Sequence, residues 1–132
     1  MIDRIYPKGS VVPRGPYSPA VRAGDFIYVS GQGPVDPVTD QLVYGDIQNE
    51  TERVLNNIRI ILEGAGATMN DVVKCNVYLS DGRDFAAMNG IYATFFGENK
   101  PARTTIECKF ANPLMKVEID CIAYKPLSSE SA

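Results

Sequence analysis

The sequence predicts an α+β domain in which two helices pack against one face of a six-stranded sheet. Three features indicate this fold: short segments rich in β-branched and aromatic residues, two longer segments in which apolar residues recur at helical spacing, and the order of these segments. Strands come first, followed by a helix, a strand, a second helix and two further strands. Because no internal repeat or linker interrupts the 132 residues, we expect a single domain over residues 1–132.

The first third of the chain predicts short strands separated by turns. The strands are expected over residues 2–6, 20–22 and 26–30, the last two forming a hairpin. The proline-rich segment 13–19 requires extended or turn backbone on both sides of Tyr17, which should therefore lie on a stiff loop. The glycine-rich segment 31–37 has Asp36 where a dinucleotide-binding fingerprint needs its third glycine, so we interpret it as a loop.

Two helices and three more strands are predicted in the rest of the chain. The first helix should begin after its N-cap Asp46 and end at Gly64 and Gly66, and the second should run from Asp84 to Phe96. Strands are expected over residues 71–79, 102–109 and 116–124, and residues 125–132 should fray. The side chains predicted to be buried are Val73, Cys75, Val77 and Leu79 of the first of these strands and Phe85, Met88, Ile91, Tyr92, Phe95 and Phe96 of the second helix.

Alternation along the last two strands divides their side chains between the two faces of the sheet. The face expected to meet the helices carries Ala102, Thr104, Ile106 and Cys108 together with Val117, Ile119, Cys121 and Ala123. Arg103 and Glu118 would then share the opposite face. They form either a weak, solvated ion pair or part of a pocket at a contact between subunits, where Arg103 binds a small carboxylate and Glu118 orients or deprotonates water.

The composition excludes several classes of function. Thirteen Lys and Arg against sixteen Asp and Glu give a net charge of −3, which disfavours nucleic-acid binding. Since the chain has no histidine, His-dependent nucleophiles and His-containing zinc sites are excluded. The three cysteines lack C-x-x-C spacing, which predicts reduced core thiols and no metal site. With no signal-like N-terminus and no apolar run of membrane-spanning length, we expect a cytoplasmic protein without membrane contact.

Motifs spread over nearly the whole chain point to one family. In order they are Gly15-Pro16-Tyr17-Ser18, Ser30-Gly31-Gln32, Gly64-Ala65-Gly66, Val77-Tyr78-Leu79, Met88-Asn89, Pro101-Ala102-Arg103-Thr104-Thr105 and Val117-Glu118-Ile119-Asp120. Each motif alone is weak, but together their order and spacing resemble the RidA/YjgF family of reactive-intermediate deaminases. The resemblance implies a homotrimer of chorismate-mutase-like α+β subunits, in which mixed six-stranded sheets form a central barrel and the pockets lie between neighbouring subunits.

The activity that the resemblance implies is hydrolysis of enamines and imines, such as 2-aminoacrylate and other 2-imino acids released by pyridoxal-phosphate enzymes, to 2-keto acids and ammonia. It implies no cofactor and no metal. By position in the motifs, Arg103 would bind the substrate carboxylate and Glu118 would hold the attacking water. The other implied substrate-binding positions are Tyr17, Ser30, Gly31, Asn89 and Thr105, the last acting through its backbone. Without the resemblance, Tyr17, Ser30 and Asn89 would be assigned structural roles.

Several alternatives stay open at the level of the sequence. Residues 33–44 and 109–115 differ from the family pattern or vary within it, and because both should border the pocket, the preferred substrate is not fixed. A noncatalytic trimer that binds small carboxylates is one alternative. A ribonuclease that inhibits translation is another, although the negative net charge disfavours it. Within the same chemistry, the substrate could instead be a larger enamine such as 2-aminomuconate, or the aminoacrylate of pyrimidine breakdown.

Overall fold

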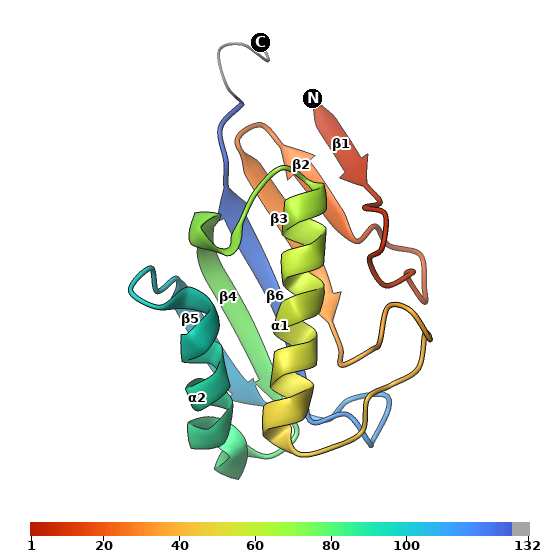
Figure 1. The fold of residues 1–132 in the computed structure, drawn as a ribbon, viewed down its shortest axis with the longest axis vertical. Helices are drawn as coiled ribbons and strands as arrows, with labels where there is room; N and C mark the ends of the chain where they lie inside the picture. The colour runs from red at the N-terminus through yellow and green to blue at the C-terminus, as the bar shows by residue number, and fades with distance from the viewer. Residues whose placement is uncertain (128–132) are drawn as a thin grey trace.

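Six strands form one sheet and two helices cover one of its faces in this computed structural model, which describes residues 1–127 (Figure 1). The elements are β1 (Ile2–Ile5), β2 (Ala20–Ala23), β3 (Phe26–Gln32), α1 (Ile47–Gly64), β4 (Val72–Leu79), α2 (Phe85–Phe96), β5 (Ala102–Glu107) and β6 (Val117–Tyr124). The predicted fold class is confirmed. Of the residues expected to fray, 128–132 lie outside the described part. Neither helix within residues 1–127 is long and apolar enough to cross a membrane.

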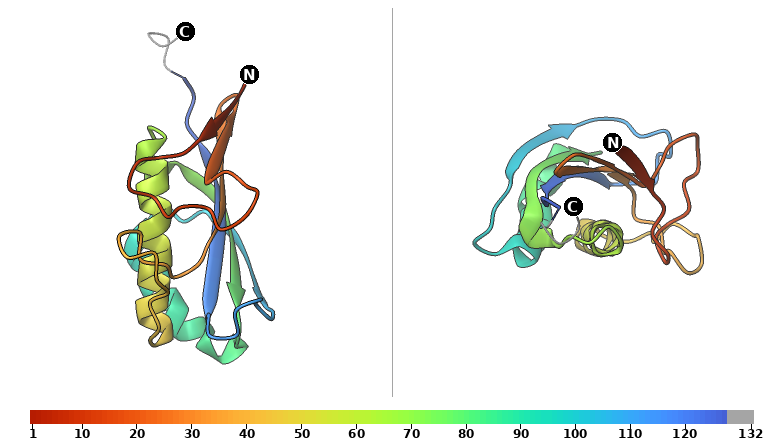
Figure 2. Two further views of the ribbon diagram at one scale, coloured as in Figure 1. Left: turned by 90° about the vertical axis from the view of Figure 1, so that its right-hand side faces the viewer. Right: turned by 90° about the horizontal axis from the view of Figure 1, so that it is seen from above.

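The sheet is mixed, and its strands lie in the order β1-β2-β3-β6-β4-β5. Every neighbouring pair is antiparallel except β4 and β5, which are parallel. The last strand in sequence, β6, therefore lies inside the sheet between β3 and β4, while β5 lies at an edge. Figure 2 shows both helices on the same side of the curved sheet, and the hydrophobic core fills the space between the two layers.

Helix α1 forms where the sequence predicts it. The carboxylate of its N-cap, Asp46, accepts a hydrogen bond from the backbone N–H of Asn49 at 2.8 Å, which satisfies one of the N–H groups left free in the first helical turn. The apolar face that α1 buries is formed by Val54, Leu55, Ile58, Ile61 and Leu62. These buried residues recur at the helical spacing from which the sequence predicted this helix.

Helix α2 also begins and ends close to its predicted bounds. Gly97 ends it with a φ of +57°, a left-handed conformation that a side chain would disfavour. Its buried side chains are Met88, Tyr92 and Phe96, whereas Ile91 and Phe95 are half-buried. Phe85 was predicted in the core but is 46% exposed, so that prediction is wrong. It stands in the first turn of α2, beyond the edge of the core.

The faces of β5 are the reverse of those predicted. Parallel pairing sets Arg103 opposite Cys75 of β4, whose side chain is completely buried, so Arg103 points toward the helices. On the outer face, Thr104 accepts a hydrogen bond from Lys74 Nζ at 2.9 Å, and Ile106 is 48% exposed. The prediction failed because alternation shows which residues share a face but not which face is covered, and an edge strand offers its apolar residues little core to enter.

Two smaller assignments are wrong and one is confirmed. Val73 is 43% exposed, since the pairing of β4 with β6 is irregular between Val72 and Lys74, and Val72 is buried in its place. Cys108, expected beneath the helices, is only half-buried. The faces of β6 agree with the prediction: Val117, Ile119, Cys121 and Ala123 are buried, and the alternate residues, Glu118 among them, point outward.

Candidate functional site

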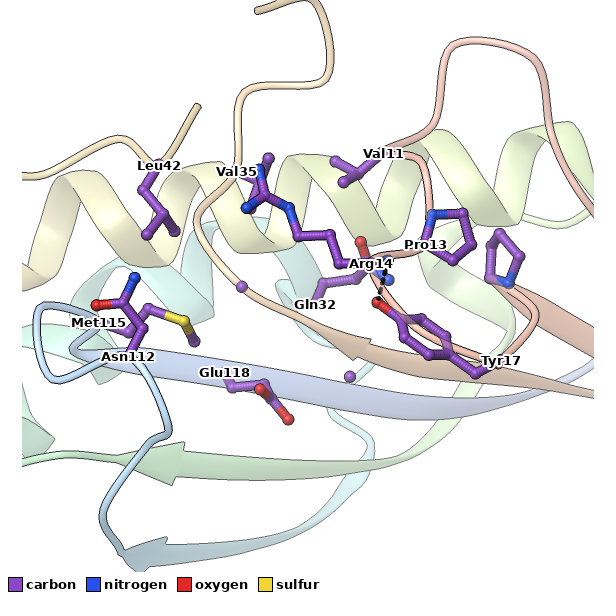
Figure 3. A pocket seen from close by; sticks show the side chains of 13 residues that line it. Val11, Pro13, Arg14, Tyr17, Gln32, Val35, Leu42, Asn112, Met115 and Glu118 are labelled. Carbon is purple, nitrogen blue, oxygen red and sulfur yellow. Dashed lines mark hydrogen bonds between the residues drawn. The ribbon is translucent and has the colours of Figure 1, made fainter. Parts of the chain in front are cut away.

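A cavity of about 210 Å³ lies between the N-terminal loop, the end of β3 and the start of β6 (Figure 3). It contains three of the predicted site residues, Tyr17, Gly31 and Glu118. No site role was predicted for the other members of its lining, among them Arg14, Gln32, Asn112, Leu42 and Met115. Only the predicted importance of the segments 33–44 and 109–115 pointed to this part of the lining, and residues of both segments do border the cavity.

The loop that carries Tyr17 is held at both ends by hydrogen bonds. The backbone N–H of Arg14 donates to the Tyr17 hydroxyl oxygen at 3.2 Å, which places that hydroxyl at the cavity. Ser30 tethers the same loop: its hydroxyl donates to the carbonyl of Ser18 at 2.6 Å, and its backbone N–H donates to the carbonyl of Pro19 at 3.0 Å. Ser30 is not in the lining of this cavity, and its contribution is to hold the Tyr17 loop in place.

Glu118 packs directly over Gly31. The pairing of β3 with β6 is irregular between Val29 and Gln32, and Gly31 lies in this stretch. A Cβ atom at Gly31 would lie 3.0 Å from Cδ of Glu118 and closer still to Oε2, so only glycine leaves room for the carboxylate in this position. Burial, followed by the negative charge of Asp120, raises the pKa of Glu118 above its ordinary value. A carboxylate with a raised pKa is a stronger base, which suits it to accept a proton from water.

Asp120 is fixed on the same outer face as Glu118. Its two carboxylate oxygens accept hydrogen bonds from Asn76 Nδ2 at 2.9 Å and from the Tyr78 hydroxyl at 3.0 Å. These two hydrogen bonds hold the Asp120 carboxylate in place two residues from Glu118 along β6. Nothing in the sequence indicated that Tyr78 and Asn76 hold this carboxylate.

The segment between β5 and β6 is anchored to α1 by a buried carboxylate. Glu50 is completely buried, its Oε1 accepts a hydrogen bond from the backbone N–H of Lys116 at 2.8 Å, and its Oε2 lies 3.6 Å from Lys116 Nζ. Burial raises the pKa of Glu50, although both contacts with Lys116 oppose this shift. Since Lys116 lies between Met115 and the start of β6, Glu50 fixes one wall of the cavity and the origin of the strand that carries Glu118.

Arg103 lies in a second hollow, of about 260 Å³, between α2 and the start of β5. Its guanidinium carbon lies 4.7 Å from the centroid of the Tyr92 ring and 5.5 Å from that of Phe85, so both aromatic faces hold the cation. Asn89 lines the same hollow, and its Oδ1 is buried with no hydrogen-bond partner among the described residues. Lys100 adds a second positive charge to the lining.

The predicted site residues therefore divide into two groups within the chain. Arg103 and Asn89 line the hollow by α2, whereas Tyr17, Gly31 and Glu118 line the cavity by β6. Arg103 faces the helices from β5, and Glu118 faces outward from β6, with β4 between the two strands. The prediction that Arg103 and Glu118 share a face is wrong, because it placed β5 the wrong way round. Thr105 lies on the same face of β5 as Arg103, as alternation requires, but this face meets the helices instead of pointing away from them.

The two buried cysteines, Cys75 and Cys121, offer no activated thiol. Burial raises the pKa of Cys75 to about 11 and that of Cys121 well above its ordinary value, so both thiols are protonated at neutral pH. Within residues 1–127, no three Cys, Asp or Glu side chains are grouped so that they could hold a metal ion. The charged groups of the two hollows are therefore Arg14, Arg103, Lys100 and the raised-pKa carboxylate of Glu118, beside several neutral hydrogen-bonding groups.

Comparisons with known proteins agree on one family. The family model for endoribonuclease L-PSP matches residues 8–125. A RutC family protein of Pyrococcus horikoshii is 48% identical over 125 residues, which is 95% of this chain and 99% of the relative. A RutC family protein of Saccharolobus solfataricus is 42% identical over the same shares of the two chains.

Solved structures of Rid proteins have the same fold. RidA from an Antarctic Psychrobacter species superposes with a TM-score of 0.87 at 37% identity, covering 92% of this chain and 98% of that one. TdcF of E. coli, solved with bound serine, gives a TM-score of 0.87 at 31% identity over 93% and 98% of the two chains. A protein of the conserved Rid family from Yersinia pestis gives 0.89 at 35% identity over 94% and 99%. The chain belongs to the RidA/YjgF family, as its motifs indicated.

Proposed function

We propose that this protein is an enamine and imine deaminase, which hydrolyses 2-imino acids such as 2-iminopropanoate, the tautomer of 2-aminoacrylate, to 2-keto acids and ammonia. The observation that carries the proposal is the presence in one chain of two complementary half-sites: a guanidinium held by two aromatic rings, and a raised-pKa carboxylate in a cavity. A 2-imino acid needs both, because its carboxylate must be fixed while water attacks the neighbouring carbon.

Arg103 is suited to bind the substrate carboxylate. A guanidinium presents parallel N–H donors that match a carboxylate in two hydrogen bonds. Tyr92 and Phe85 stack against it and restrict its orientation before substrate arrives, which lowers the entropy lost on binding. The relative TdcF was solved with bound serine, a small molecule that carries the same α-carboxylate. This agrees with a site for small amino-acid derivatives in the family.

The complete site would lie between two protomers of a homotrimer. Within one protomer Arg103 and Glu118 occupy different hollows on opposite faces of the sheet. Arg103 stands on the edge strand β5, where it is accessible to a neighbouring chain, and the cavity with Glu118 opens beside the other half of the sheet. Packing the β5 edge of one protomer against the cavity of the next would bring the two half-sites together.

Hydrolysis would then proceed as an addition followed by an elimination. Arg103 fixes the carboxylate, and the carboxylate of Glu118 accepts a hydrogen bond from water and takes its proton as the oxygen attacks the imine carbon. Glu118 returns this proton to the nitrogen, so the carbon–nitrogen double bond becomes single and a carbinolamine forms. Glu118 then takes the proton of the new hydroxyl group and passes it to the amino group as the carbon–oxygen double bond forms and the carbon–nitrogen bond breaks, and ammonia and a 2-keto acid leave. Positioning and one charge contact are sufficient for such a reactive substrate, without a covalent intermediate.

A noncatalytic trimer that binds small carboxylates is the second candidate. The hollow with Arg103 and Asn89 favours it, because that hollow could bind a carboxylate without any contribution from Glu118. The two functions differ in one respect that can be measured: both bind keto acids saturably, but only the deaminase accelerates ammonia release.

The test measures keto-acid and ammonia formation while a pyridoxal-phosphate dehydratase generates 2-aminoacrylate. Wild type should accelerate the reaction over the protein-free control, and both Arg103→Ala and Glu118→Gln should abolish the acceleration while the trimer persists in light scattering. Arg83→Ala is the matched control, because Arg83 is an exposed arginine paired with Asp81 at 2.7 Å and lies outside both hollows. No acceleration by a folded wild-type trimer with several imino acids would reject the deaminase and favour the binding protein.

A further inference from the structure

A second arginine lines the cavity that contains Glu118. Figure 3 shows Arg14 extending from the Tyr17 loop along the cavity toward Val35, on the side away from Glu118. Arg14 and Glu118 are the two charged side chains in the described lining of this cavity. The apolar side chains of the lining are Val11, Pro13, Pro19, Val35, Leu42 and Met115.

The position of Arg14 is fixed by the loop that faces it. Its Nη2 donates to the backbone carbonyl of Asp40 and to the Asp40 carboxylate at 3.3 Å. That loop is itself ordered by Asp36, whose carboxylate accepts hydrogen bonds from the N–H groups of Val38 and Thr39 at 2.8 and 3.1 Å. Arg14 is therefore held by its ion pair in one place at the cavity.

The guanidinium of Arg14 has donors to spare. Its Nε and Nη1 groups make no hydrogen bond to any residue from 1 to 127, and both side chains of the pair with Asp40 are more than half exposed. An exposed ion pair of this kind adds little to stability. A second carboxylate could bind the unused N–H groups of Arg14 without displacing Asp40, because a guanidinium has five donors in a planar fork.

Building on the proposed deaminase function, we propose that Arg14 is a specificity-determining residue that selects 2-imino acids carrying a second carboxylate at the end of the side chain. The α-carboxylate is bound by Arg103 of the neighbouring protomer, the reacting carbon lies by Glu118, the methylene groups contact the apolar wall, and the distal carboxylate meets Arg14. The reaction is unchanged: imine and water give a 2-keto dicarboxylic acid and ammonia.

Binding of product analogues separates this inference from the catalytic one. Calorimetry would give the dissociation constants of 2-oxoglutarate and of 2-oxohexanoate, which has an uncharged end. We expect wild type to bind 2-oxoglutarate about tenfold more tightly, the effect of one charge-assisted hydrogen-bonded pair. Arg14→Gln should bring the ratio of the two constants close to one. Asp40→Asn should increase the ratio, because it removes the negative charge that competes for Arg14, and asparagine tolerates the left-handed φ of +60° at this position.

The matched control is Arg83→Gln, which removes an exposed arginine from another Arg–Asp pair and should leave the ratio at its wild-type value. If Arg14→Gln keeps the wild-type preference for 2-oxoglutarate over 2-oxohexanoate, the inference is overturned. Loss of that preference in Lys100→Gln also overturns it, since Lys100 lines the other hollow. Turnover of 2-iminopropanoate by wild type is measured in parallel. If that turnover is absent the deaminase function fails, while the ratio still decides whether Arg14 selects a second carboxylate.

Discussion

Replacing Gly31 with alanine should disable Glu118 while leaving the fold intact. The added Cβ would lie 3.0 Å from Cδ and 3.3 Å from Cγ of Glu118, and closer to Oε2. Ordinary contacts between such atoms need about 3.5–4.0 Å, so the carboxylate must move by roughly 0.5–1 Å. A displacement of about 1 Å in a reacting group costs on the order of 100-fold in rate. We therefore expect kcat/KM for 2-iminopropanoate to fall by about that factor.

Stability should change little in the same variant. Gly31 does not have a positive φ, so alanine introduces no backbone strain, and the group that must move is the end of a flexible side chain. The free energy of unfolding should stay within about 1 kcal/mol of wild type, as for most substitutions that create no cavity or unpaired polar group. Gly33→Ala is the matched control, because its Cβ would meet only the end of the Met115 side chain, Cε at 3.1 Å and Sδ at 3.3 Å, and this flexible side chain can adjust.

The assay is steady-state deamination combined with a double-mutant cycle. If Gly31→Ala acts through Glu118, then adding it to Glu118→Gln should cost little further activity, because the two changes affect the same step. Activity of Gly31→Ala within twofold of wild type would refute the proposed position of Glu118. Full additivity of the two substitutions would also refute it, since Gly31 would then act independently of the carboxylate.

Three further outcomes are expected. Burial raises the pKa of Glu50 in the folded state, so the stabilisation from its protonated form is present below about pH 4.5 and is lost as pH rises through the folded pKa. The unfolding free energy of Glu50→Gln should therefore increase relative to that of wild type between about pH 4 and 7, and a relative decrease over that range would contradict the raised pKa. Phe85→Leu removes one of the two aromatic rings that contact Arg103, so it should weaken keto-acid binding about threefold with kcat unchanged, and Phe85→Tyr should restore binding. A fall in kcat without weaker binding would show that Phe85 does not act by holding Arg103. In urea denaturation at fixed protein concentration, Gly90→Ala should raise the unfolding free energy by about 1 kcal/mol, because its Cβ meets nothing within 4 Å. Gly64→Ala should give no such increase, since its Cβ would collide with Pro7, and equal increases in the two variants would show that Pro7 moves aside without cost.

Local signals in the sequence predicted most of the secondary structure correctly. The N-cap Asp46, the terminating Gly97 and the helical spacing of apolar residues from Val54 to Leu62 each depend on neighbours within a few residues. Their physical causes are local, namely unsatisfied N–H groups, left-handed backbone and one buried stripe. Such features can be recognised without knowledge of what packs against the element.

Features that depend on distant partners were predicted less well. The orientation of β5 follows from its parallel pairing with β4, in which Arg103 aligns with Cys75, and nothing within residues 102–107 specifies that partner. The motifs named Arg103, Glu118, Tyr17, Gly31 and Asn89 as site residues, but they could not show that one chain divides these residues between two hollows. Arg14 was not predicted as a site residue, because the contact that holds it at the cavity is made by Asp40, 26 residues away along the chain.

The central position of β6 has a consequence for synthesis of the chain. Strands β1 to β3 and strands β4 and β5 emerge from the ribosome first, but they have no contact with each other in the sheet until β6 pairs with both β3 and β4. Until residues 117–124 are released, the nascent chain therefore exposes two unpaired strand edges, which are prone to intermolecular pairing. A premature stop before residue 117 would leave two half-sheets that cannot join, so such truncated products should aggregate rather than persist as partly active protein.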